Sequence, residues 1–143
     1  MRVVLLTTNT LHHLYFSTML RDTGYLVGVA LETPGREPTF PTFHPFEAHR
    51  DEYEKEYFFH NTPPRFEDLT EIHSTDSIND PETLDWMNRM RPDLTVVFGT
   101  RRLSPKTIEV ANLHCLNLHG GNPEMYRGLD SHYWTIYHSD FEN

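Results

Sequence analysis

The chain has 143 residues, of which 37% are hydrophobic and 13% aromatic, and its formal net charge is -9. This length and composition predict one globular domain with its own core and exclude a disordered chain. The acidic balance argues against a surface that binds nucleic acid through its phosphates, and it favours a small-molecule partner.

The residues at the start of the chain bear on its location. After Met1 and Arg2, the apolar run of residues 3–6 is too short for the core of a signal peptide, and no apolar run reaches the length of a membrane span. The single cysteine, Cys115, cannot form an intrachain disulfide, and we expect it to be a small buried hydrophobic residue. These features predict a cytoplasmic protein without a membrane partner, and they are compatible with a homo-oligomer.

The first elements follow a strand–helix–strand pattern. Residues 3–6 are all apolar, as in a strand that is buried on both faces of a parallel sheet. The polar turn Thr8-Asn9-Thr10 offers N-cap residues for a helix that begins near Leu11 and ends at Gly24. A second strand is expected over residues 25–31.

The middle of the chain is interrupted by prolines. They recur over residues 33–45, which predicts a long irregular loop. A charged, tyrosine-rich helix is expected over residues 46–59, as a covering helix that Pro63-Pro64 ends. Residues 69–72 are expected to form a short strand.

Three further elements complete the pattern. Asp80-Pro81 is a good helix start, and that helix should run to Met90. Residues 94–98 read as a buried strand, a short helix should run over residues 104–111, and a last apolar strand covers residues 115–118. The alternation predicts an α/β fold with a Rossmann-like, doubly wound and mostly parallel sheet.

Ligands of such sheets bind at the carboxyl ends of the strands, where Asn9, Arg101 and Asn117 are expected to lie. No glycine-rich phosphate loop follows the first strand, so a dinucleotide cofactor is not expected. The ten histidines show no convergent metal-ligand spacing, and with one cysteine there is no cysteine pair to complete a zinc set. We therefore expect no metal.

The most informative segment is Asn117-Leu118-His119-Gly120-Gly121. Side chains alternate along a strand, so Asn117 and His119 should point to the same side. The two glycines let the backbone leave the strand sharply and approach a ligand. An amide and an imidazole placed together can donate hydrogen bonds to an oxygen that becomes negative in a transition state.

This segment, followed by Tyr126-Arg127-Gly128, resembles the signature of the formyltransferases that use 10-formyltetrahydrofolate as donor. Residues 93–105 also resemble the strand and loop that border the folate pocket in that family. The resemblance implies formyl transfer to an amine, with Asn117 and His119 as catalytic residues. It also implies a donor pocket bordered by Gly99, Thr100, Arg101, Arg102 and Leu103, with the backbone of Arg101 and Leu103 recognising the pterin.

The acceptor is expected near the start of the first helix. Backbone N–H groups there can hold an anionic group, and residues 12–16 (HHLYF) resemble formyltransferases of glycan biosynthesis, which act on nucleotide-linked amino sugars. Arg127 is expected to organise its loop by bonding backbone carbonyls. The expected substrate-binding residues are Thr8, Asn9, Thr10, His12, Gly120, Gly121 and Arg127.

Two features differ from the family pattern. Pro123 lies one position earlier than the family's proline, and Glu124 takes that place. The family's third catalytic residue, an Asp a few dozen residues after the histidine, would lie beyond residue 143. We therefore expect residues 1–143 to be the N-terminal part of a catalytic domain, with a sheet incomplete at its C-terminal side and little activity alone.

Alternative functions stay open at this point. Within the class they are methionyl-tRNA formyltransferase, glycinamide ribonucleotide formyltransferase and formyltetrahydrofolate hydrolase. A truncated, non-catalytic domain that binds folate or a sugar nucleotide is the alternative from a different class.

Overall fold

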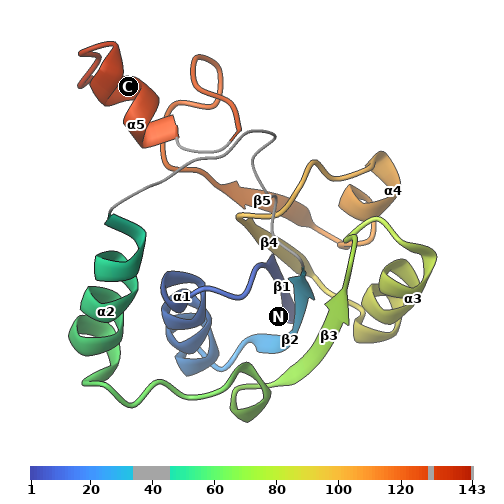
Figure 1. The fold of residues 1–143 in the computed structure, drawn as a ribbon. Coiled ribbons are helices and arrows are strands. Elements are labelled where there is room, and N and C mark those ends of the chain that lie inside the picture. Colours follow the sequence, from blue (N-terminus) through green and yellow to red (C-terminus); the bar gives the residue numbers. More distant parts are fainter. Residues whose placement is uncertain (34–45, 129–130, 143) are drawn as a thin grey trace.

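A computed structural model of the chain describes residues 1–33, 46–128 and 131–142 (Figure 1). It contains a five-stranded sheet in the order β3-β2-β1-β4-β5, and every pairing is parallel. The strands are β1 (Val3–Thr7), β2 (Leu26–Glu32), β3 (Glu71–Thr75), β4 (Leu94–Phe98) and β5 (His114–Leu118). The helices are α1 (Leu11–Asp22), α2 (Phe46–Phe59), the 3-10 helix η1 (Phe66–Asp68), α3 (Pro81–Met90), α4 (Pro105–Ile108) and α5 (Ser131–Tyr137). The predicted α/β, Rossmann-like fold is confirmed.

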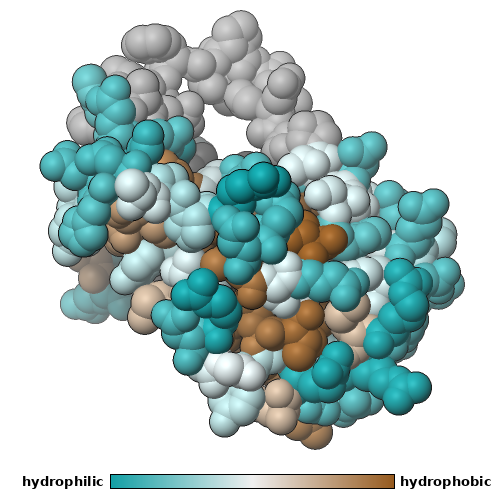
Figure 2. All heavy atoms as spheres, turned by 90° about the horizontal axis from the view of Figure 1, so that it is seen from below, coloured by the Kyte–Doolittle hydropathy of each residue, from teal (hydrophilic) through white to brown (hydrophobic). Residues whose placement is uncertain are grey.

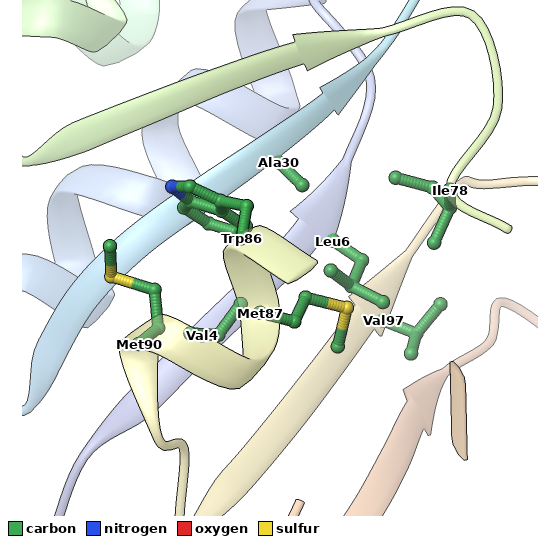
Figure 3. Close-up of a cluster of buried hydrophobic side chains, with 8 residues drawn as sticks. All are labelled: Val4, Leu6, Ala30, Ile78, Trp86, Met87, Met90 and Val97. Carbon is green, nitrogen blue, oxygen red and sulfur yellow. The ribbon is translucent and has the colours of Figure 1, made fainter. Parts of the chain in front are cut away.

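The two faces of the sheet carry separate cores, because side chains alternate along each strand. On one face, Leu5 and Val29 pack with Leu14 of α1 and Phe59 of α2. On the other face, helix α3 lies across β1, β2 and β4 (Figure 3). Its Trp86, Met87 and Met90 pack there against Val4, Leu6, Ala30, Ile78 and Val97.

The central position of β1 explains its composition. All five of its residues are buried, since both faces are covered and both edges are paired. A run without polar alternation is what such a strand requires. This is why the apolar run at residues 3–6 could be identified from the sequence.

Two expected elements differ in extent. The third strand begins at Glu71 and not at residue 69, because Leu69 is buried at the end of η1. β3 is a polar edge strand, held by backbone pairing with β2 from Gly28↔Glu71 to Glu32↔Thr75, so no apolar pattern marks it. Helix α4 ends at Ile108 and not at residue 111. The proline-rich loop expected over residues 33–45 lies outside the described residues from position 34 onward.

The opposite edge, β5, is largely exposed. Leu116 and Leu118 are 52% and 45% exposed, although they pair with Val96 and Phe98, which pack against the core under α1 and α2. Cys115 is half-buried against the α3 core, and this burial raises the pKa of its thiol, which disfavours the thiolate form.

In the face seen in Figure 2, hydrophilic residues surround a smaller number of visible hydrophobic ones. Of the helices in the described residues, none is long and apolar enough to cross a membrane.

Candidate functional site

The register of the sheet brings three predicted site segments to one edge. Thr7 of β1 pairs with Phe98 of β4, and Phe98 pairs with Leu118 of β5. The three strands therefore end side by side, and residues 8–10, 99–103 and 119–121 all leave the sheet at its carboxyl edge (Figure 1). This is the edge at which open α/β sheets bind ligands.

Asn117 presents an available amide at this edge. It pairs in register with Val97, so both side chains point to the face that α3 covers. The Asn117 side chain is exposed, and no hydrogen bond engages it within the part of the chain that the structure describes. Its amide can therefore donate to a ligand oxygen.

His119 is half-buried and is oriented by its own turn. Its Nδ1 lies 2.8 Å from the carbonyl oxygen of Gly121. When Nδ1–H donates to that carbonyl, the Nε2 of a neutral ring is an acceptor, and Nε2 donates only when the ring is protonated. Gly121 itself packs closely on Ser131 at the start of α5, where an added Cβ would lie 3.3 Å from the Ser131 Cβ. Gly120 is exposed beside it.

The loop at residues 99–103 is here named the donor loop, after the donor pocket that the sequence predicts for it. Contacts with Glu32 and Asp76 hold its backbone and Arg101 in place. Arg101 N–H donates to Glu32 Oε2 at 2.8 Å, and the Arg101 guanidinium donates to the carbonyl oxygen of Asp76. The Arg101 N–H is therefore engaged within the protein, and recognition of a pterin by the backbone of Arg101 and Leu103 stays a prediction. The Thr100 hydroxyl donates to the Arg101 carbonyl, Arg102 is exposed, and Leu103 packs partly on the α3 core.

Gly99 makes the closest approach between the donor loop and α1. Its φ of +82° lies in the left-handed region, and an added Cβ would lie 2.6 Å from His13 Nε2. Both observations require glycine at this position.

The start of α1 is organised around His13. The hydroxyls of Thr8 and Thr10 each lie 2.8 Å from His13 Nδ1, and the ring packs edge-on against Phe98. Burial, and secondarily the neighbouring His12, lowers the pKa of His13 to about 3, so the ring is neutral at physiological pH.

The predicted acceptor residues in this region differ in their availability. The hydroxyls of Thr8 and Thr10 are hydrogen-bonded to His13. The Nδ1 atom of His12 lies 3.2 Å from Glu54 Oε2 of α2. Asn9 is exposed, and its side chain has no hydrogen bond to the described residues. Thr10 is the N-cap residue of α1, but its side chain makes no cap hydrogen bond. The N–H groups of the first turn are therefore available to an anion.

The segment that follows His119 is stabilised by its own contacts. Arg127 Nε donates to the Pro123 carbonyl at 3.2 Å, which is the loop-organising contact expected for this arginine. The Tyr126 hydroxyl donates to Asp140 Oδ2 at 2.8 Å, and this hydrogen bond raises the pKa of Tyr126. The Asp140 carboxylate is thus engaged in a hydrogen bond with Tyr126.

Three residues of this region were not expected from the sequence: Glu32, Asn79 and His13. Glu32 could have been noticed as an acidic residue directly after a buried strand. Asn79 and His13 carry no comparable signal, because their roles depend on long-range contacts. Among the described residues, no group of three His, Cys, Asp or Glu side chains could hold a metal ion.

Several known formyltransferases are similar to this chain in sequence or in fold. No family model matches the chain. Methionyl-tRNA formyltransferase of Trichodesmium erythraeum (strain IMS101) is 36% identical over 63 residues, which are 43% of this chain and 19% of that protein. The same enzyme of Syntrophus aciditrophicus (strain SB) is 34% identical over 64 residues, or 44% of this chain and 20% of that protein. The matched segment thus spans about a fifth of these relatives.

One solved structure is similar in fold to nearly the whole of this chain. The phosphoribosylglycinamide formyltransferase of Bacillus halodurans superposes with a TM-score of 0.56 over 96% of this chain and 66% of that chain, at 12% identity. At that identity the superposition supports the fold, while the sequence matches carry the relationship. The chain is thus similar in sequence, over half of its length or less, to methionyl-tRNA formyltransferases, and similar in fold to a phosphoribosylglycinamide formyltransferase.

Proposed function

We propose that the chain provides the donor pocket and two catalytic side chains of an enzyme that transfers a formyl group from 10-formyltetrahydrofolate to an amine. The observation that carries this proposal is the in-register ending of β1, β4 and β5, which places the donor loop beside Asn117 and His119. The pterin would lie along the donor loop, and the formyl carbon beside the end of β5.

The side chains fit the reaction. The acceptor amine attacks the formyl carbon, negative charge develops on the formyl oxygen, and the bond from that carbon to the folate nitrogen then breaks. The Asn117 amide, which is exposed and has no partner among the described residues, donates to the developing oxyanion. His119 Nε2 donates to the same oxygen when the ring is protonated, or accepts the proton of the amine when it is neutral.

We propose a nucleotide-linked amino sugar as the acceptor. The net charge of -9 disfavours a polyanion such as tRNA, whereas the first turn of α1 can hold one phosphate group beside the exposed Asn9. Methionyl-tRNA is the second candidate, because three curated relatives are named as methionyl-tRNA formyltransferases.

A direct competition separates the two acceptors. Formyl transfer is measured with each acceptor for the 143-residue chain and for the product of the coding sequence extended beyond codon 143. The proposal predicts transfer to the amino sugar by the extended form, and weaker acceptor binding after Asn9→Ala with unchanged donor binding. Preferential formylation of methionyl-tRNA would reject the sugar and keep the chemistry, and transfer to neither acceptor would reject both acceptors.

A further inference from the structure

We propose that Glu32 and Asn79 are positioning residues that fix the donor loop from opposite sides. This inference rests on the proposed function only for the identity of the ligand. The hydrogen bonds that hold the loop are present without a ligand, so their effect on the exchange of the loop amides can be measured without one.

Glu32 joins two loops through one buried carboxylate. The residue is 2% exposed and ends β2, directly beside the end of β1. Its Oε1 accepts the N–H of Ile78 at 3.1 Å, and its Oε2 accepts the N–H of Arg101 at 2.8 Å. Burying a carboxylate is costly unless it is hydrogen-bonded, and here each oxygen holds one backbone group.

Asn79 holds the other half of the loop. Its Nδ2 donates to the Arg102 carbonyl at 3.0 Å, and its Oδ1 accepts the N–H of Ser104 at 2.7 Å. The same Oδ1 accepts the Thr107 hydroxyl of α4 at 2.8 Å. One amide thus fixes the residues on both sides of Leu103 and ties them to the first turn of α4.

Together, Glu32 and Asn79 engage several backbone groups of the donor loop and leave others without a partner among the described residues. Arg101 N–H, Arg102 C=O and Ser104 N–H are all occupied by these two side chains. The N–H and C=O of Leu103 make no hydrogen bond to any described residue, while its side chain is anchored in the α3 core. The two side chains therefore hold the backbone on both sides of Leu103 in one arrangement.

The test uses Glu32→Gln in the 143-residue chain. Glutamine keeps the shape but presents an NH2 group to one of the two N–H donors, so one hydrogen bond is lost. We expect the amide that faces this NH2 group, that of Arg101 or of Ile78, to exchange at least about tenfold faster. The dissociation constant for 5-formyltetrahydrofolate should rise by roughly tenfold or more, while the thermal transition stays cooperative.

The matched control is Glu71→Gln. Glu71 lies on the neighbouring strand and accepts the Trp86 Nε1 proton at 2.9 Å, a bond that the glutamine oxygen retains. It lies at the opposite end of the strands, since it pairs with Gly28 and Glu32 pairs with Thr75. This variant should leave amide exchange in the donor loop and folate binding unchanged.

Asn79→Ala provides a second variant should Glu32→Gln fail to fold. It removes both the acceptor for the Ser104 N–H and the donor to the Arg102 carbonyl, and we expect for it the same loss of folate affinity with faster exchange at Ser104. Unchanged exchange in folded Glu32→Gln and Asn79→Ala variants would overturn the positioning role. Faster exchange without any folate binding by the wild-type chain would keep that role and reject the proposed donor.

Discussion

At the scale of single residues, the contact between Gly99 and His13 connects the donor loop to α1. The glycine has a left-handed backbone, and the imidazole occupies the space that a side chain would need. Neither feature follows from the sequence, where Gly99 is one glycine after a strand and His13 one of two adjacent histidines.

Gly99→Ala should be destabilising for two reasons. A left-handed backbone costs a residue with a Cβ about 1–2 kcal/mol, and displacing the ring adds overpacking of about 1–3 kcal/mol. Gly24→Ala is the matched control, since Gly24 has a similar φ of +75° but no atom within 4 Å of an added Cβ. Urea unfolding should show a larger loss for Gly99→Ala, and equal losses would mean that the His13 contact has no energetic role.

His13 should make stability depend on pH. Its folded-state pKa of about 3 lies below the ordinary value of 6.5, so the unfolded chain binds more protons between these values. The stability contributed by His13 is complete above pH 6.5 and is lost as the pH falls toward 3, with a slope of at most about 1.4 kcal/mol per pH unit.

His13→Asn removes this titration and places an amide near the hydroxyls of Thr8 and Thr10. The difference in free energy of unfolding between the wild-type chain and this variant should be largest above pH 6.5 and should shrink toward pH 4. A difference that is constant over this range would show that His13 is not held neutral by the fold.

At the scale of elements, the sequence predicted the buried strands and the long helices well. Short local patterns predict these elements: an apolar run marks β1 and β4, and Asp80-Pro81 marks the start of α3. β3 could not be placed correctly, because it is a polar edge strand defined by its pairing with β2. The proposed catalytic pair, Asn117 and His119, was predicted from a local motif, whereas Glu32 and Asn79 form hydrogen bonds across sequence separations of 69 and 25 residues.

The packing of α3 on β2 can be tested at Gly28. An added Cβ would lie 2.8 Å from Cζ2 of Trp86, so Gly28→Ala should cost about 1–3 kcal/mol. In a Trp86→Phe background the obstructing ring atoms are gone, and an alanine inside a strand should then be neutral or stabilising by about 0.4–1 kcal/mol. A double-mutant cycle by urea unfolding measures this coupling, and additive effects would contradict the packing described.

At the scale of the whole molecule, the proposed function needs a donor-binding edge, two catalytic side chains and an acidic residue for proton transfer. Among the acidic residues that follow His119, Asp140 is bonded to Tyr126, and Asp130 lies outside the described residues. We therefore expect the 143-residue chain to bind the donor but to transfer formyl groups little or not at all. Turnover equal to that of an extended form would show that other residues perform the proton transfer.

The central claim is that the carboxyl edge of the sheet binds a reduced folate between the donor loop and the end of β5. The most direct measurement is an NMR titration of the 143-residue chain with 5-formyltetrahydrofolate, an unreactive donor analogue. The account predicts saturable binding, with amide shifts concentrated at residues 99–103 and 117–121. The absence of saturable binding by a folded chain, or shifts concentrated at the amino edge around Arg2 and Arg91, would contradict it.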